Sequence, residues 1–142
     1  MELIQAFKRI INETYRIAWA TSVNNIPNVR IVNFCNIPEN KGVIYFASFR
    51  GLPKTLEFSQ NNIVSFTTIP VLEESSEHIR VKNATIRKSD LTIYDLKDEF
   101  VKKQSSYEEI IAQAGEKLDV YEIHFNEATV ILDLGKSGKL TF

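Results

Sequence analysis

One turn in the sequence carries the polar residues best suited to binding an anion. Within the run SFRGLPK, Ser48 provides a hydroxyl, and Arg50 and Lys54 provide two cations. Pro53 suits the first position of a helix, because its missing N–H would have no partner inside the helix. The free N–H groups of a helix start, two cations and a hydroxyl together suit a phosphate. The alternative is a solvated turn whose basic residues are incidental.

Arg30 could provide a second contact to such an anion. It lies in a predicted strand over residues 28–37, where it shares one face with Val32 and Phe34. A guanidinium among apolar neighbours needs a polar partner. One interpretation is that the stem covers the sheet while the charged head reaches water. The other is that the head binds the same anion.

Acid–base or covalent catalysis by side chains has little support. His78 and His124 fall in different predicted strands, and no zinc-ligand spacing surrounds them. The sequence motifs of nucleophile elbows, zinc proteases and phosphate-binding loops do not occur. A pair of Cys35 with His78 stays open, although a lone cysteine in an apolar strand is usually inert. An anion site of this kind indicates a phosphorylated cofactor that brings the chemistry.

Strands are the main elements that must position these residues. Alternating and β-branched runs predict strands over 15–23, 28–37, 43–47, 63–69, 78–89, 120–125 and 128–134, the last two as a hairpin. Apolar spacing and end signals predict helices over 2–14, 52–61, 90–103 and 105–114. Short connections suit antiparallel pairing. We therefore expect a mostly β (α+β) fold, a split barrel of six or seven antiparallel strands with flanking helices.

Three local features are specific enough to compare with a structure. Residues 24–27 (NNIP) predict the turn between the first two strands. Strict alternation over the fifth strand places Asn83 on the same face as Ile79. Ser105 and Glu108 have the spacing of a capping box at the start of the last helix.

Composition favours a single domain over residues 1–142. The net charge of −1, from 17 basic and 18 acidic residues, gives no general case for nucleic acid or an anionic membrane as a partner. The single cysteine excludes an internal disulfide and is consistent with a reducing cytoplasmic location. The sequence contains no signal-peptide-like apolar run and no stretch near the roughly 20 apolar residues of a membrane span.

Five segments together resemble the pyridoxamine 5′-phosphate oxidase-like, FMN-binding split β-barrel superfamily. They are NVRIVNF, IYFASFRGLPKTLEFSQNN, IVSFTT, HIRVKNATIRK and YEIHFNEATVILDLG, in this order. The resemblance implies a homodimer with FMN in a cleft between the subunits. It also implies that Arg30 and Lys54 hold the FMN phosphate. The positions that it places along the ring and ribityl chain are Ile31, Val32, Asn33, Ala47 and Ser48.

The sequence departs from the family pattern at several positions. Pro53 stands where a second basic residue is common, and Arg50 is expected to compensate. His78 takes the place of a glutamine near the ring, and Asn83 takes the place of a glycine. Cys35 replaces a lysine of the oxidases proper, whose C-terminal arginine and histidine are also missing. Oxidation of pyridoxamine phosphate itself is therefore not expected.

Three hypotheses follow from the resemblance, and a purely structural dimer is the remaining option. The first is an FMN-dependent oxidoreductase of the flavin reductase, nitroimidazole-resistance or general-stress type. It would take hydride from a donor such as a reduced nicotinamide and pass it to a small acceptor. The second is a flavin-binding carrier or sensor without turnover. The third is a barrel that has lost FMN and binds another ligand, for example haem with His78 or His124 as axial ligand.

Overall fold

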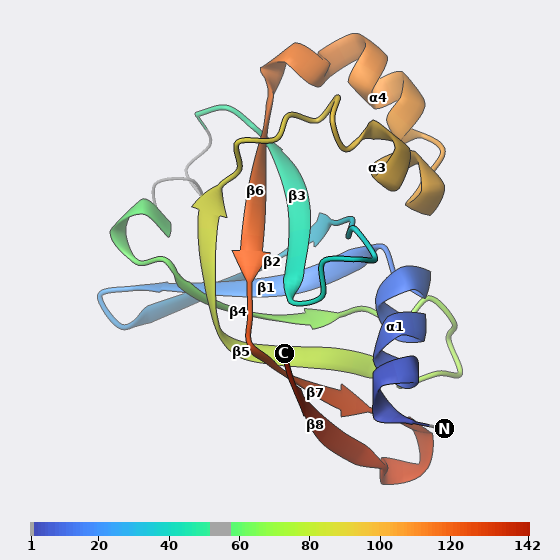
Figure 1. Ribbon diagram of the computed structural model, residues 1–142. Helices are drawn as coiled ribbons and strands as arrows, with labels where there is room; N and C mark the ends of the chain where they lie inside the picture. Colours follow the sequence, from blue (N-terminus) through green and yellow to red (C-terminus); the bar gives the residue numbers. More distant parts are fainter. Residues whose placement is uncertain (1, 52–57) are drawn as a thin grey trace.

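A curled antiparallel sheet forms a half-barrel, and helices pack on its outside (Figure 1). The structure is a computed structural model that describes residues 2–51 and 58–142. The strands are β1 (Arg16–Val23), β2 (Ile26–Asn33), β3 (Val43–Phe49), β4 (Ile63–Thr68), β5 (His78–Lys88), β6 (Leu118–His124), β7 (Glu127–Ile131) and β8 (Ser137–Thr141). The α-helices of the described part include α1 (Leu3–Glu13), α3 (Lys97–Lys103) and α4 (Tyr107–Ala114), and short 3-10 turns are η1 (Gly115–Lys117) and η2 (Asp133–Gly135). The predicted α+β class, mostly strand, is confirmed, and the described residues form a sheet of eight strands.

The two ends of the sheet meet at one short bridge. Six strands pair in the order β2-β1-β4-β5-β6-β3, so β2 and β3 end this path, while β7 and β8 branch off from β5. Just beyond β2, Cys35 exchanges two backbone hydrogen bonds with Tyr45 of β3, at N···O distances of 2.8 and 2.9 Å. In Figure 1, β3 and β6 run across the direction of β1 and β4, because the sheet curls strongly between them. The half-barrel therefore closes at this bridge.

A two-residue turn sets the register of β1 against β2. Asn24 and Asn25 have φ values of 53° and 65°, the left-handed conformation that a two-residue hairpin turn requires and that asparagine tolerates. β2 begins directly afterwards at Ile26, so the predicted turn over 24–27 is two residues too long. The resulting register places Trp19 opposite Arg30.

A β-bulge in β5 reverses the predicted face assignment. The pairing of β5 with β4 shifts by one residue, so that two residues of β5 lie opposite Ser65. Asn83 has a φ of 67° at this bulge. Ile79 is buried before the bulge, whereas Ala84 and Ile86 are buried after it. The prediction that Asn83 shares the face of Ile79 by strict alternation is therefore wrong.

The last two predicted strands do not form a hairpin with each other. β6 pairs with β3 and β5, whereas β7 pairs with β5 and β8. Phe125, between β6 and β7, is buried against the rings of Phe7 and Phe66. The chain therefore runs on beside β5 instead of turning back. The final hairpin joins β7 to β8 through a turn in which Leu134 and Gly135 have φ values of 65° and 75°.

The helix α3 begins later than the sequence pattern predicts. It starts at Lys97, although the pattern predicts a helix from residue 90. Within the preceding segment, Ile93 and Leu96 turn into an apolar core. The Thr92 N–H donates to the Asp95 carboxylate at 2.8 Å, and this local bond competes with helix formation.

The other predicted helix ends have mixed outcomes. The expected capping box is wrong, because Ser105 contributes only its carbonyl, which accepts from the Glu108 N–H at 3.1 Å. The predicted end of the last helix at residue 114 is confirmed, and Gly115 follows it. The helix predicted over 52–61 lies mostly outside the described residues, of which 58–60 are helical.

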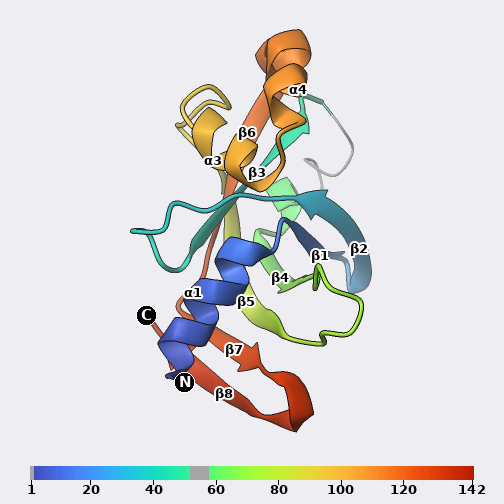
Figure 2. The same cartoon turned by 90° about the vertical axis from the view of Figure 1, so that its right-hand side faces the viewer.

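Two apolar cores support the sheet. The main core fills the half-barrel and is covered by α1, which buries Ala6, Phe7, Ile10 and Ile11. The second core lies between β3, β6 and the pair α3 and α4, and its buried members are Cys35, Tyr45, Ile93, Leu96, Phe100, Tyr107, Ile111 and Val120. Figure 2 shows α3 and α4 beside β3 and β6, separate from α1. The closing bridge of the half-barrel thus belongs to the second core.

Lys103 connects the helical layer to α1. Its ammonium donates to the carbonyls of Ile11 and Thr14 at the C-terminal end of α1, at 2.7 and 2.6 Å. It also lies 4.5 Å from the centroid of the Phe34 ring. A cation is favourable at a helix C-terminus. Burial nevertheless lowers the pKa of Lys103 to about 8.

Substitutions at Asn83 test the bulge. The left-handed conformation strains a β-branched residue, so Asn83→Val should lower the free energy of unfolding by about 1–2 kcal/mol. Asn83→Gly should change it by less than about 0.5 kcal/mol, because glycine adopts this conformation freely. Urea denaturation measures both, with Lys82→Val as the matched control on the same strand. Equal stability of the valine and glycine variants would contradict the bulge.

The pH dependence of stability tests the environment of Lys103. Folding lowers its pKa from 10.5 to about 8. Between these values the unfolded chain binds more protons than the folded chain, so this lysine adds stability as the pH rises through that window. Relative to Lys103→Met, the natural chain should become more stable between about pH 7 and about pH 10 in urea denaturation. Lys97→Met, in the same helix, is the control for the loss of a lysine. A constant or falling difference for Lys103→Met would refute the lowered pKa.

Candidate cofactor site

Arg30 lies over an aromatic ring at one end of the half-barrel. Its guanidinium carbon is 4.5 Å from the centroid of the Trp19 ring, and its Nη2 donates to Thr21 Oγ1 at 3.3 Å. Trp19 is fully buried, and Arg30 is half-buried. A guanidinium stacked on an aromatic face is held in a defined plane. The fold therefore positions this cation, in contrast to a surface arginine whose head moves in water.

The backbone edges of β2 and β3 separate beside the bridge. Residues of an antiparallel strand alternately bond to their partner strand and point away from it. The register of the first hairpin directs the N–H and C=O groups of Ile31 and Asn33 away from β1, on the side where Cys35 meets Tyr45. By the same alternation, Ala47 of β3 faces back toward β2. The described part of the chain has no second bridge between these strands. We call this gap, bordered by Ile31, Asn33 and Ala47, the split.

Side chains of β2 lie on both sides of the split. Ile31 is 63% exposed, whereas Val32 is partly buried against the main core. Asn33 is hydrogen-bonded to the hydroxyl of Tyr107, in α4. Burial raises the pKa of Tyr107, so this hydroxyl keeps its proton at neutral pH. One wall of the split is thus the helical layer.

Ala47 and Ser48, at the end of β3, point in opposite directions. Ala47 packs against the second core. Ser48 is buried and its hydroxyl donates to the Phe49 carbonyl at 3.4 Å. It lies on the same face of β3 as Phe46, whose ring centroid is 5.1 Å from that of Trp19. Ser48 therefore faces the interior that also holds the ring below the arginine.

Lys54, the second predicted phosphate ligand, lies outside the described residues. Phe58, which follows that segment, is buried, and its ring centroid is 6.1 Å from that of Trp19. Asn61 then donates from Nδ2 to the carbonyl of Ser22 at 2.8 Å. The chain after the undescribed segment thus returns to the part of β1 that lies beside Arg30 of β2.

Arg50 is engaged by an acidic partner. Its Nη2 lies 3.1 Å from Oδ1 of Asp119 and donates to the Glu116 carbonyl at 3.2 Å. Lys88 lies 3.8 Å from the other oxygen of Asp119. Together these side chains line a cavity of about 470 Å³ that does not include Arg30. The structure therefore does not bring the two arginines together.

His78 lies on the outer face of β5, away from Arg30. Its Nδ1 is 2.7 Å from the Ser76 carbonyl. A carbonyl only accepts, so we assign the proton to Nδ1, and Nε2 then accepts from Arg80 at 3.3 Å. Strand pairing places Asn33 on the same face, three strands away, roughly 14 Å at the usual strand spacing.

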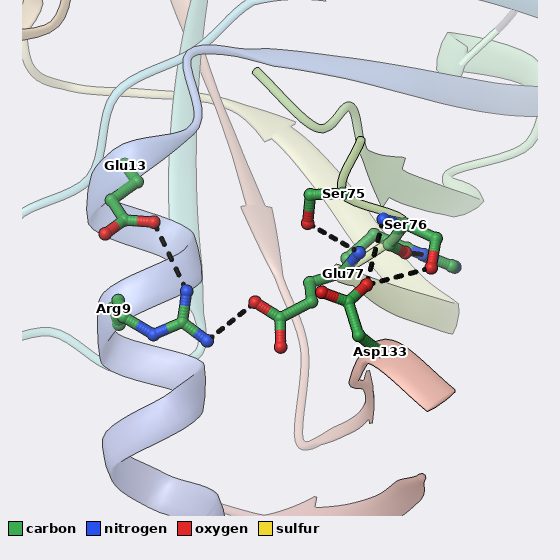
Figure 3. A network of polar contacts seen from close by, with 7 residues as sticks. Arg9, Glu13, Ser75, Ser76, Glu77 and Asp133 are labelled. Carbon is green, nitrogen blue, oxygen red and sulfur yellow. Dashed lines mark hydrogen bonds and ion pairs between the residues drawn. The ribbon is translucent and has the colours of Figure 1, made fainter. Parts of the chain in front are cut away.

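A polar network holds the segment that leads into β5 (Figure 3). Arg9 of α1 binds Glu77 at 2.8 Å, in an ion pair that also appears in the figure. Asp133 accepts from both the N–H and the hydroxyl of Ser76, each at 3.1 Å. The network therefore fixes the carbonyl that orients the imidazole of His78.

A second polar cluster surrounds Glu122 in β6. The Ser89 hydroxyl donates to Oε2 at 2.6 Å, while Arg87 Nε and His124 Nε2 lie 2.7 and 2.6 Å from Oε1. Burial acts to raise the pKa of Glu122, but these hydrogen bonds outweigh it and hold the pKa below its usual range. The imidazole contacts the carboxylate and not the hydroxyl, so this cluster is not a serine nucleophile with its base.

Cys35 is an inert core residue. Its side chain is fully buried in the second core, and burial raises the pKa of the thiol. His78 bonds to Ser76 and Arg80 instead. The pair of Cys35 with His78 that the sequence left open is not formed.

The sequence analysis missed Trp19, Thr21 and Asp119. The sequence could have revealed the first two, because a two-residue turn at Asn24-Asn25 predicts a register in which Trp19 lies opposite Arg30. Asp119 had no such signal. It meets Arg50 across the pairing of β3 with β6, which joins strands far apart in the sequence.

Solved structures with the same fold come from several kinds of protein. A FAD-binding protein from Mesorhizobium loti has a TM-score of 0.64 at 12% identity, over 98% of this chain and 94% of that one. General Stress Protein 26 from Bacillus anthracis str. Sterne has a TM-score of 0.64 at 18% identity, over 99% and 100%. A haem-binding protein from Mycobacterium smegmatis has a TM-score of 0.71 at 11% identity, over 99% of this chain. The present chain spans only 58% of that protein's length. At these identities the likeness shows the fold alone.

Sequence comparison identifies the family. No curated protein matches the sequence. A family model described as pyridoxamine 5′-phosphate oxidase-like matches residues 10–137, from the middle of α1 to the start of β8. The matched residues include β2 and β3, the two strands that border the split. The half-barrel fold is consistent with this family. The chain belongs to the pyridoxamine 5′-phosphate oxidase-like family.

Proposed function

We propose that this chain is an FMN-binding domain over residues 1–142 that acts as a flavin-dependent oxidoreductase. The observation that carries the proposal is the split, two open strand edges beside the positioned cation of Arg30. The FAD-binding structural neighbour adds support for a flavin. Bound FMN supplies a ring that accepts hydride from a donor and gives hydride or electrons to an acceptor.

The split fits the polar edge of a flavin ring. Backbone N–H and C=O groups of Ile31, Asn33 and Ala47 point into it. Such groups need partners, and a heterocycle with alternating carbonyl and N–H groups can bond to them. Fixed N–H donors at this edge would stabilise the negative charge that develops on reduction. Ile31 and Val32 then provide apolar surface along the ring.

The phosphate of FMN fits the end of the site at Arg30. Stacking on Trp19 holds the guanidinium in a plane, which suits the fork-like binding of phosphate oxygens. Lys54 remains our second ligand, and Ser48 faces the same interior. Arg50 would have to leave Asp119 to take part, so it contributes to the phosphate only through a rearrangement.

A homodimer would complete the site. The end strand β2 exposes three large apolar side chains, Ile26, Val29 and Ile31, at 71%, 65% and 63%. Exposed apolar end strands are normally covered in native proteins. A second copy of the chain that covers β2 would also cover the split from outside. His78 lies on the same outer face of the sheet as Asn33. We propose that it comes near the flavin ring only in this dimer.

Oxidation of pyridoxamine phosphate is not expected at this site. Cys35, at the position of a family lysine, is fully buried and cannot reach a substrate in the split. We propose instead that the flavin takes hydride from a reduced nicotinamide and passes it to a small acceptor.

We also propose a cytoplasmic location. None of the helices in the described part of the chain is long and apolar enough to cross a membrane.

Haem is the alternative ligand, because one structural neighbour is a haem-binding protein. Axial ligation usually needs a free imidazole nitrogen. Here Nε2 of His78 accepts from Arg80, and Nε2 of His124 lies 2.6 Å from Glu122. Each histidine would have to break a hydrogen bond to bind iron, which favours flavin over haem.

The absorbance spectrum of the purified protein is the first test. Flavin bands, with FMN released on denaturation, are expected, and turnover with a reduced nicotinamide should follow. A Soret band would replace the proposal by the haem alternative. A yellow protein without turnover for any donor and acceptor would instead indicate a carrier or sensor.

Two variants test the phosphate contact. Arg30→Ala and Lys54→Ala should each weaken FMN binding by about 1–3 kcal/mol, the usual cost of one lost charge-assisted contact. Quenching of FMN fluorescence measures the affinity. Riboflavin, which lacks the phosphate, should bind both variants as it binds the natural chain. Lys139→Ala, on β8, is the control cation. Unchanged FMN affinity in both site variants would remove the phosphate assignment.

A charge on the exposed face of β2 tests the dimer. Val29→Glu should convert the dimer to a monomer and weaken FMN binding at least tenfold, because a buried carboxylate is costly at an apolar interface. Sedimentation velocity gives the mass. Leu72→Glu, at an equally exposed position outside the sheet, is the control. A natural chain that is monomeric and still binds FMN tightly would contradict the shared site.

A further inference from the structure

A separate cavity lies between α1 and the chain that joins β2 to β3. It measures about 150 Å³ and none of its lining residues borders the split. Its apolar wall is made by Phe7 and Ile11 of α1, Ile44 of β3 and Phe125. All four side chains are at most 5% exposed. An apolar cavity of this size accommodates a molecule as large as benzene.

The cavity is built into the fold. Gly42, on its rim, has a φ of 83°, and its carbonyl accepts from the Phe125 N–H at 2.8 Å. A Cβ atom at Gly42 would lie 2.6 Å from the Phe125 carbonyl oxygen. Only glycine therefore allows this close approach, which fixes one wall against another. The space does not arise from a loosely packed loop.

A pair of amide side chains, the buried Asn36 and the exposed Asn12, lines the cavity without using all its hydrogen-bonding groups within the protein. Asn36 is only 7% exposed, and its Nδ2 donates to Oδ1 of Asn12 at 3.0 Å. Within the described part of the chain, Oδ1 of Asn36 accepts no hydrogen bond and Nδ2 of Asn12 donates none. The amide pair thus presents polar atoms to a ligand of the cavity.

Two cations border the same cavity. Lys8 of α1 and Lys41 of the joining chain both line it. Neither ammonium has a carboxylate within ion-pair distance in the parts of the chain that the structure describes. Glu39 lines the adjoining groove and not the cavity. The rim therefore carries positive charge that the protein itself does not neutralise.

We infer that this cavity binds a small aromatic carboxylate. The ring fits the apolar wall, the carboxylate lies between Lys8 and Lys41, and the Asn12 amide donates to one of its oxygens. Charge on the rim distinguishes an acid from a neutral compound of the same shape. The inference stands on residues outside the split and does not rest on FMN binding.

Titration of the full chain with benzoate tests the site. The backbone amide of Gly42 and the side-chain amide of Asn36 should shift in ¹H–¹⁵N spectra, with a Kd on the order of 0.1–1 mM for so small a ligand. Benzamide, which is neutral, should bind at least tenfold more weakly. The double variant Lys8→Met/Lys41→Met should lose benzoate affinity at least tenfold while retaining benzamide. Lys97→Met, on α3, is the matched control and should bind as the natural chain does.

Three outcomes would overturn the inference. They are the absence of shifts at Gly42 and Asn36, equal affinity for benzoate and benzamide, and unchanged affinity in the double variant. Addition of FMN separates this site from the split. Displacement of benzoate by FMN would place the benzoate in the split and reject the cavity. Simultaneous binding of benzoate and FMN supports the cavity site. If the chain does not bind FMN, the proposed function fails, while the benzoate shifts still test the cavity.

Discussion

The backbone pairing between β2 and β3 stops after one bridge, and the candidate site depends on that interruption. If the ladder continued past Cys35 and Tyr45, the groups of Asn33 and Ala47 would bond to each other. The half-barrel would then close without a gap. The bridge itself is held by the second core, which buries both of its residues under α3 and α4. The helical layer therefore supports the one point from which the two edges separate.

The same layer is tied to the rest of the molecule by charge. The Lys103 ammonium reaches from α3 to the last carbonyls of α1 and lies over Phe34, the residue before the bridge. Partial burial of a cation has a cost, which appears in its lowered pKa. Three contacts from one side chain offset this cost, because they join α1, the end of β2 and the helical layer. The bridge that closes the half-barrel is thus stabilised by contacts with α1 and α3, which lie far apart in the sequence.

Sequence reasoning predicted the fold class and the face of β2 on which Arg30 lies, because both rest on short-range patterns. The alternation in β2 placed Arg30 and Ile31 on opposite faces, and the structure agrees. It failed where the strict alternation of a strand is interrupted or its first residue is misplaced. These errors are the face of Asn83 at the bulge and the length of the turn before Ile26. It also failed where distant strands meet, since nothing near Arg50 signals Asp119. Left-handed asparagine was the common cause of the first two errors, because its φ is not visible in a hydrophobic pattern.

The turn at Asn24-Asn25 links the predicted functions of β2 to a single backbone geometry. Side chains of a strand alternate between faces, so a slip of one residue would exchange them all. Arg30 would leave Trp19 and point outward, while Ile31 would turn inward. The open edge would then carry the groups of Val32 in place of those of Ile31 and Asn33. The stacking of Arg30 on Trp19, the unpaired edge of β2 and the exposure of Val29 and Ile31 are therefore consequences of one register, which two left-handed residues impose.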